Sequence, residues 1–451
     1  MLRILGRHLV LGLAVAVASG GLLSAITPPT VKFTDTKLPN GLRLIVAEDH
    51  VAPVFSVAVV YNVGSRNERA GRTGFAHLFE HMMFKGSENV GPGEHFYTIF
   101  SNGGTMNGTT NKERTVYFET MPANQLDAAL FLEADRMRSL AIIKENLDNQ
   151  RNAVQEERRL GVDNQPYGRT FEVRDELAYT NFAYAHSVIG SMVDLSAATV
   201  EDVAAFFKTY YAPNNAVLSI VGDVDPKATL EKVRKYFESI PSQPAPPPVD
   251  MTEPPQTEER RTTIEDALAK LTRLDMVYKT PPSSSPDDDA LRVLGTVLSS
   301  GRSSRFYENI VRQKQLTANV SAFAGESRGP ALFSIASTVN PGKAVADLEA
   351  AIESEIERVK AGPIEEWEME KARNNARNQL VNSLGSALDR AVTLGEDALF
   401  YNNPDRINTR ADSIAKVTAA DVQRVAKQYL VKTGRTLVIT IPKAAPAKGG
   451  Q

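Results

Sequence analysis

Hydrophobic and polar residues recur along the chain with two different periods, which predicts a mixed α and β protein. "GLRLIVAEDH" (41–50) and "PVFSVAVVYNVGS" (53–65) carry the short apolar runs of β-strands. "MNGTTNKERTVYFETM" (106–121) alternates polar and apolar residues and predicts another strand. Apolar residues at helical spacing predict helices over about 126–140 and 144–160. Because the order lacks a strict βαβ rhythm, we expect an α+β fold with a largely antiparallel sheet that helices cover on one face.

The same pattern occurs twice. "TVEDVAAFFKTYYAPNNAVLSIVG" from Thr199 matches "TAADVQRVAKQYLVKTGRTLVITI" from Thr418 at one constant offset, without a gap. Each copy begins with Thr and an acidic residue, as a capped helix does, and then runs through a turn into an apolar strand. The sequence therefore predicts two homologous α/β halves rather than a chance likeness of two amphipathic helices.

A proline-rich stretch separates these two halves. Prolines remove backbone donors and keep the chain extended, so "PSQPAPPPVDMTEPPQTEE" cannot form a helix or a central strand. We expect a first domain over residues 28–240, a linker over 241–262, a second domain over 263–443 and a flexible tail over 444–451.

The N-terminus has the composition of an export signal. Arg3 and Arg7 precede an apolar run over residues 9–25, and small residues interrupt that run. A cleaved signal peptide over residues 1–27 fits better than a spanning helix, which needs about 20 apolar residues. An uncleaved anchor is the alternative. The chain is expected to be exported, to the periplasm in a Gram-negative cell, with no membrane span once the signal is removed.

Composition narrows the possible chemistry. The chain has 451 residues, of which 42% are hydrophobic, and a formal net charge of −3. These values are typical of a globular protein and give no reason to expect nucleic acid as a partner. There is no cysteine, so disulfides, thiolate metal sites and a cysteine nucleophile are excluded. A metal ion would need histidine and carboxylate ligands.

Two of the six histidines lie four positions apart in "TGFAHLFEHMMFKG" (73–86). The segment lacks an internal Gly or Pro from residue 75 to residue 85, so it predicts a helix that ends at Gly86. His77 and His81 then lie on one face, with Glu80 beside them. Burying these three groups in an apolar helix is costly unless they bind something, and a zinc ion held by both imidazoles would remove that cost. The alternative is two core histidines that donate to backbone carbonyls.

A catalytic zinc site needs a third protein ligand, and a carboxylate is expected because His50, His95 and His186 stand alone in the sequence. "NQRNAVQEERRLGV" offers Glu156 and Glu157, which point about 100° apart on a helix. Glu157 shares its face with apolar residues, so we expect it to face inward and to complete one Zn²⁺ site per chain. A solvated Glu157 paired with Arg158 is the plainer interpretation.

With these residues in place, the chain resembles the pitrilysin-type zinc metallopeptidases, which include insulin-degrading enzymes and mitochondrial processing peptidases. "GFAHLFEHMMFKGS" carries the family's inverted H-x-x-E-H motif, and Glu157 follows His81 at the spacing where the family places its third ligand. "NQPYGR" and "HSVIGSMVDL" resemble further family segments. "NGGTMNGTTNKERTVYF" resembles the substrate-binding edge strand, which implies that an extended peptide lies near Asn107, Gly108 and Thr109.

The chain departs from the family at two places. Gln150 stands where a second glutamate often supports the metal ligands, so it could orient them by hydrogen bonding but adds no charge. The family also uses an arginine and, seven positions later, a tyrosine to hold the substrate carbonyl. The corresponding stretch keeps Arg312 but has Asn319 at the tyrosine position, or Ala318 if one residue is deleted.

The resemblance implies zinc-dependent hydrolysis of peptide bonds, with Glu80 as the general base. Because the tyrosine is missing, we expect the catalytic subunit of a two-chain enzyme. Its partner would be a homologous chain that lacks H-x-x-E-H but carries the Arg and Tyr; a homodimer is the alternative. Two other interpretations are a non-enzymatic assembly or binding subunit and a structural zinc protein.

Overall fold

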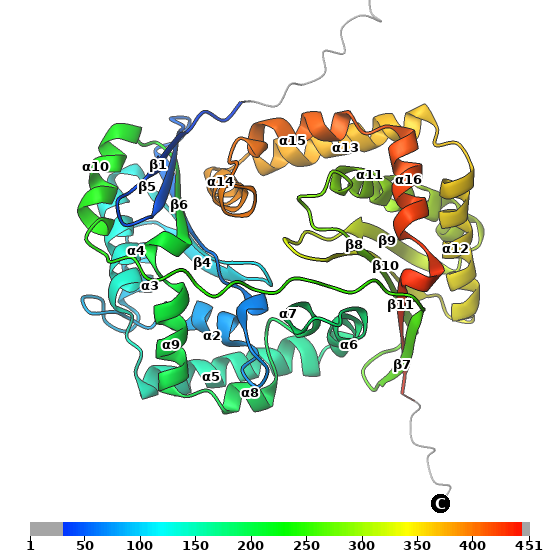
Figure 1. Cartoon of the computed structure of the whole chain (residues 1–451), viewed down its shortest axis with the longest axis horizontal. Helices are drawn as coiled ribbons and strands as arrows, with labels where there is room; N and C mark the ends of the chain where they lie inside the picture. Colours follow the sequence, from blue (N-terminus) through cyan, green and yellow to red (C-terminus); the bar gives the residue numbers. More distant parts are fainter. Residues whose placement is uncertain (1–29, 444–451) are drawn as a thin grey trace, which may run out of the picture. The chain divides into compact units, whose positions relative to one another are not determined.

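The computed structural model describes residues 30–443, and within this range two β-sheets carry the fold (Figure 1). The predicted signal peptide (1–27) and the predicted tail (444–451) lie outside the described residues. Among the described helices, none combines the length and the apolar composition that a bilayer-spanning segment needs.

The first sheet is mostly antiparallel. Its strand order is β1-β2-β6-β3-β5-β4, and only the β2/β6 pair is parallel. The strands are β1 (Thr34–Lys37), β2 (Arg43–Glu48), β3 (Val54–Tyr61), β4 (Thr105–Thr110), β5 (Thr115–Pro122) and β6 (Ala216–Gly222). The central strands β3 and β6 are buried along nearly their whole length, because both faces of the sheet are covered.

Helices of the first half cover one face of this sheet. Leu78 and Phe79 of α2 pack with Val57 and Val59 of β3 in the main core. The helices of this half are α2 (Phe75–Met82), α3 (Glu94–Ser101), α4 (Leu126–Ser139), α5 (Lys144–Arg158), α6 (Gly168–Ala178), α7 (Phe182–Ala185), α8 (Met192–Ser196), α9 (Val200–Tyr210) and α10 (Pro226–Phe237). The predicted helices over 126–140 and 144–160 correspond to α4 and α5.

The second sheet has the same plan with one strand fewer. Its order is β7-β11-β8-β10-β9, and only β7/β11 is parallel. The strands are β7 (Arg260–Asp266), β8 (Arg273–Thr280), β9 (Thr317–Ala324), β10 (Ala331–Val339) and β11 (Arg435–Pro442). The helices of this half are α11 (Asp288–Ser299), α12 (Val345–Ala361), α13 (Glu366–Ser383), α14 (Ala387–Tyr401), α15 (Arg406–Ala415) and α16 (Ala419–Tyr429).

The predicted repeat is a structural repeat. The offset that carries Thr199 onto Thr418, called the repeat offset below, also carries β3 onto β8 and α9 onto α16 with identical bounds. The helix caps correspond as well, because the Thr199 hydroxyl accepts from the N–H of Asp202 and the Thr418 hydroxyl from the N–H of Asp421. The prediction of two homologous α+β halves is confirmed.

The two halves exchange one helix each, which the prediction of helices on a single face missed. Leu394 of α14 belongs to the second half by sequence, yet it packs against Ile45 and Val60 on the other face of the first sheet. In return, Ala178 at the end of α6 packs against Val277 of the second sheet. The repeat offset relates α6 to the start of α14, so the exchange is reciprocal.

Two further boundaries differ from the predictions. The segment 106–121 is a hairpin of β4 and β5 rather than one strand, because the Asn111 side chain accepts from the N–H groups of Glu113 and Arg114 and closes a turn. The linker expected over 241–262 ends earlier, since β7 begins at Arg260 and pairs with β11.

Candidate metal centre

Helix α2 places the side chains of His77 and His81 next to each other on one face. The helix begins after Gly74, whose φ of +86° and whose close approach to Ile189 leave no room for a side chain. Its apolar residues lie in the core, and the His77 and His81 rings lie side by side with centroids 4.9 Å apart. The predicted helix is present over Phe75–Met82, but its C-cap is Met83 rather than Gly86, so it ends earlier than expected and a turn leads to Gly86.

Glu157 of α5 meets the two imidazoles. Its Oε1 lies 3.5 Å from His77 Nε2, and its Oε2 lies 3.2 Å from His81 Nε2. One ligand atom from each of the three residues lies within 4.8 Å of the others. Glu156 instead pairs with Arg159 at 2.9 Å. The structure thus brings together the predicted set of His77, His81 and Glu157 and leaves Glu156 outside it.

This donor set fits a zinc ion. Two imidazole nitrogens and one carboxylate form a common catalytic zinc site that leaves one position open. Burial lowers the pKa of His77 to about 4, which keeps its imidazole neutral, as metal binding requires. A hydrogen bond with His81 lowers the pKa of Glu157, which keeps that group a carboxylate. His77 Nδ1 is buried without a hydrogen-bond partner in the described range.

Glu80 lies beside the three candidate ligands and faces strand β4. A Cβ atom on Gly108 would lie 2.9 Å from Glu80 Cγ, so the absence of a side chain at Gly108 makes room for Glu80. Burial raises the pKa of Glu80, and a hydrogen bond with Thr110 partly opposes that shift. A carboxyl group with a raised pKa can accept a proton close to neutral pH.

Strand β4 is the edge of the first sheet, as the resemblance implied. Asn107 and Thr109 are exposed and Gly108 is buried, so the three predicted substrate-binding residues lie at the edge next to Glu80. Arg114, which sequence reasoning overlooked, donates to the Thr109 carbonyl at 2.9 Å and pairs with Glu396 of α14 at 2.6 Å. Helix α14 is thereby tied to the edge strand.

Gln150 is buried on α5, but it does not contact the candidate ligands through a hydrogen bond. Its amide nitrogen donates to Asn149, and no other hydrogen bond of this side chain is found in the described part of the chain. Among the described contacts, Gln150 therefore does not orient a candidate ligand by hydrogen bonding.

A buried carboxylate holds the start of α2 in place. The buried Glu68 carboxylate accepts from the N–H groups of Gly74 at 2.9 Å and Ala76 at 2.7 Å, at the start of the motif helix. The same carboxylate lies 3.0 Å from His186 Nε2. His186 has no histidine or motif neighbour in the sequence, so only the fold reveals this contact.

The other two isolated histidines also have carboxylate neighbours. His50 contacts Glu48 at 2.7 Å on the surface. Buried His95 clusters with Glu119 and Glu133, with one ligand atom of each within 4.8 Å of the others. The buried Arg136 guanidinium already pairs with Glu133, so a metal ion there would lie beside a fixed positive charge.

The residues of the second half that the resemblance singled out are exposed. The Arg312 side chain is 63% exposed and pairs with Glu308 one turn away. Asn319 and Ala318 are exposed on the edge strand β9. Their exposure leaves them accessible, but no tyrosine stands at either position.

Both halves of the chain match family models of peptidases. Residues 43–191 match the family model for insulinase (peptidase family M16), and residues 197–376 match the model for the peptidase M16 inactive domain. The chain is 31% identical to the zinc protease PqqE of Helicobacter pylori, over 91% of this chain and 93% of that protein. The chain belongs to peptidase family M16. The resemblance inferred from the motifs is confirmed.

Other similarities agree with this assignment. A probable mitochondrial-processing peptidase subunit beta of Arabidopsis thaliana is 26% identical over 88% of this chain and 76% of that protein. The crystal structure of a protease from Helicobacter pylori has a TM-score of 0.87 at 30% identity and covers 91% of this chain and 100% of its own. The peptidase M16 inactive domain from Pseudomonas fluorescens shares the fold, with a TM-score of 0.83 at 18% identity over 92% of this chain and 99% of its own.

Proposed function

We propose that this M16 protein is a zinc-dependent endopeptidase that hydrolyses extended peptides. One observation carries the proposal: two imidazole nitrogens of α2 converge on the Glu157 carboxylate, with Glu80 between them and the sheet edge. A structural zinc site would need a fourth protein ligand, and the described cluster contains three.

The residues divide the chemistry among them. His77, His81 and Glu157 would hold Zn²⁺, which when bound supplies a Lewis acid and lowers the pKa of water. Glu80 would take a proton from the attacking water and pass it to the leaving amine. The edge strand at Asn107 and Gly108 would hold the substrate main chain, which gives affinity with little sequence preference.

Metal removal and hydrolysis test this proposal together. The purified chain is assayed on an unstructured peptide as isolated, after chelation and after zinc is restored. We expect activity to disappear with the metal and to return with it. The His81→Ala variant should lose zinc and activity together, since one of three ligands is gone. Turnover by the metal-free protein would contradict the proposal.

We further propose that a second, homologous chain completes the active enzyme. Arg312 is exposed without a tyrosine at Asn319 or Ala318, and the loss of one donor to the reacting carbonyl typically costs about 100- to 1,000-fold in rate. The isolated chain should therefore hydrolyse peptides weakly, and a homologue that carries the Arg and Tyr should raise the rate. Full activity of the isolated chain, unchanged by Arg312→Ala, would show that no such donors are needed.

The export signal inferred for residues 1–27 remains a proposal. Cell fractionation with an antibody against the folded part of the chain tests it. We expect the protein outside the cytoplasm, and replacement of Arg3 and Arg7 by Glu should retain it inside.

A further inference from the structure

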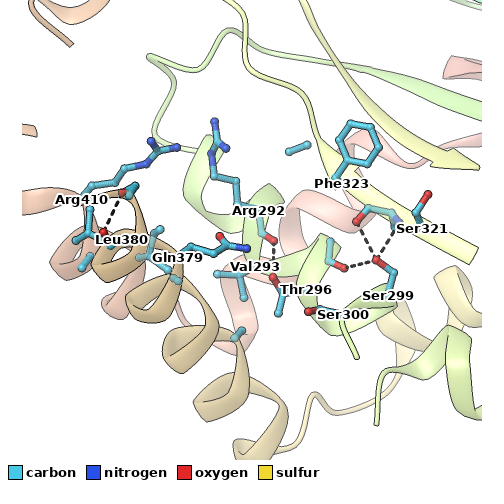
Figure 2. Close-up of a pocket in the computed structure, with 18 residues that line it drawn as sticks. Arg292, Val293, Thr296, Ser299, Ser300, Ser321, Phe323, Gln379, Leu380 and Arg410 are labelled. Atoms are coloured by element: carbon cyan, nitrogen blue, oxygen red, sulfur yellow. Dashed lines mark hydrogen bonds between the residues drawn. The ribbon is translucent and has the colours of Figure 1, made fainter. Parts of the chain in front are cut away.

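The second half contains a cavity of about 590 Å³ between helices α11, α13 and α15 and the edge strand β9 (Figure 2). Its size is in the range of small-molecule binding sites. Two arginines line it, Arg292 from α11 and Arg410 from α15. Figure 2 shows both guanidinium groups toward the upper left of the view.

The cavity occupies the place that the metal centre has in the first half. The repeat offset carries the four residues of the proposed catalytic site onto residues that all line the cavity: His77 onto Thr296, Glu80 onto Ser299, His81 onto Ser300 and Glu157 onto Ala376. Three hydroxyl groups and a methyl group replace two imidazoles and two carboxylates. The second half thus has a cavity lined by hydroxyl and methyl groups at the positions where the first half has the candidate metal ligands.

One of these hydroxyl groups closes part of the sheet edge. Ser299 Oγ accepts from the Ala322 N–H at 2.9 Å and lies 3.0 Å from the Ala322 carbonyl. A peptide main chain therefore cannot pair with β9 at Ala322 unless these bonds break. A ligand of this cavity would enter through a side chain or a chain terminus rather than as an added strand.

The arginines offer donors to such a ligand. Arg292 Nε donates to Asp288 at 2.7 Å, whereas its Nη2 is buried without a hydrogen-bond partner and lies 3.7 Å from Glu326. Within residues 30–443 the Arg410 guanidinium makes no ion pair. Burial raises the pKa of the neighbouring Asp397 to about 7, a shift that the charges of Arg406 and Arg410 partly oppose, and Asp397 lies 3.4 Å from Arg406. Arg292 is thus ion-paired with Asp288 and Glu326 and keeps Nη2 as a donor without a hydrogen bond, whereas the Arg410 guanidinium is available to an anion.

The remaining wall of the cavity is apolar. Phe323 is 52% exposed at the edge strand. The other apolar lining residues include Val293, Leu380, Ala411 and Ile414. A ligand that matches these walls has a carboxylate at one end and an apolar body at the other.

We propose that this cavity binds the carboxylate of an amphipathic ligand through Arg292 and Arg410. The carboxylate belongs either to the C-terminal residue of a peptide with an apolar side chain or to a free aliphatic or aromatic acid. Arginine forms paired, charge-assisted hydrogen bonds with carboxylates, which suits both sources. Binding of a peptide in this cavity rests on the proposed peptidase function. The cavity would then anchor a substrate by its C-terminus in the half that lacks the metal ligands.

The test measures binding rather than turnover. The zinc-loaded Glu80→Gln protein is titrated into an N-terminally fluorescein-labelled pentapeptide that ends in phenylalanine, as the free acid and as the C-terminal amide, and anisotropy reports affinity. We expect the acid to bind about 10- to 100-fold more tightly, the scale of a charge-assisted hydrogen bond. Unlabelled N-acetyl-phenylalanine competes to the same extent if the site accepts a free acid, and only weakly if it requires a peptide.

Three variants in the Glu80→Gln background locate the effect. Arg410→Gln removes one cation. Ala376→Leu places a larger side chain in the cavity lining without a change of charge. Both variants should abolish the preference for the acid while their zinc content stays the same. Arg292→Gln should do likewise but breaks a buried ion pair, so the first two variants decide. Arg234→Gln, an exposed position on α10, is the matched control and should keep the preference.

Equal binding of acid and amide would overturn the inference. So would a preference that survives Arg410→Gln and Ala376→Leu, because the carboxylate would then bind elsewhere, for example at the zinc. A failure of the peptidase proposal can be distinguished from a failure of this inference. The first would appear in the hydrolysis and metal assays of the unsubstituted chain, whereas the difference in affinity between acid and amide could still be measured.

Discussion

Glu68 Oε2 lies 3.0 Å from His186 Nε2, although the two residues are far apart along the chain. The same buried carboxylate accepts from the N–H groups of Gly74 and Ala76. One carboxylate therefore fixes the start of the motif helix and joins it to the segment that contains His186. The aim of the two candidate zinc ligands depends on this attachment, because both histidines lie within two turns of it.

Glu68→Ala should destabilise the protein more than an ordinary surface substitution. It leaves two buried N–H groups without an acceptor, and each such group costs about 1–3 kcal/mol. Thermal unfolding of the zinc-loaded protein measures the effect, with Glu88→Ala as the exposed control. Equal melting temperatures for the two variants would mean that Glu68 does not hold the helix.

The contact with Glu68 should also make stability depend on pH. Burial lowers the pKa of His186, but the hydrogen bond and charge of Glu68 outweigh it, so the pKa lies above the usual 6.5. A raised folded-state pKa contributes stability that is complete below about 6.5 and is lost as the pH rises through the folded value. The melting temperature should thus fall from about pH 6 to pH 8 more in the unsubstituted protein than in His186→Gln. Parallel pH profiles would show that His186 is not charged in the folded state.

The adjacent glutamates of α5 should differ sharply in their effect on zinc. Glu157 lies 3.2 Å and 3.5 Å from the two imidazoles, whereas Glu156 pairs with Arg159. Glu157→Gln should weaken zinc binding by more than the roughly 10- to 100-fold that loss of a residue supporting a ligand costs, and Glu156→Gln should change it little. Competition with a chelator of known affinity gives both constants, and the reverse ranking would assign the ligand to Glu156.

Gly108→Ala should impair turnover without removing the metal. The new methyl group would lie 2.9 Å from Glu80 Cγ and push the proposed base aside, and a displacement of about 1 Å can cost about 100-fold in rate. The measurement is kcat on an unstructured peptide, together with zinc content. Gly161→Ala, where no heavy atom lies within 4 Å of the added Cβ, is the control. Unchanged kcat in Gly108→Ala would mean that Glu80 tolerates the displacement or has no catalytic role.

Sequence patterns predicted those features that depend on residues close together in the chain, such as the direction of side chains on one helix. The one-turn spacing of His77 and His81 fixed their common face. The apolar face expected to turn Glu157 inward is mostly not buried, since Leu160 is 57% exposed and the Glu157 side chain 49% exposed; Glu157 is placed instead by its contacts with the two imidazoles. The hairpin between β4 and β5 was missed because its polar turn continues the alternation of the strands, and only the Asn111 turn bonds break it.

Long-range packing decides the remainder, and sequence periodicity does not report it. Leu394 marks an apolar face on α14, but nothing in that pattern says which sheet the face will cover. The same limit hid the contact of His186 with Glu68 and the enclosure of His95 by Glu119 and Glu133. The partners in each contact are distant in sequence, so they carry no common local signal.

In the proposed mechanism Glu80 acts on water beside a zinc ion that it does not bind. The most direct test measures zinc content and peptide hydrolysis on the same preparation of Glu80→Gln, with the partner chain present if one is required. We expect about one zinc per chain, as in the unsubstituted protein, and a loss of at least about 100-fold in kcat, the usual scale for removal of a general base. Near-normal hydrolysis by the zinc-loaded variant would contradict it.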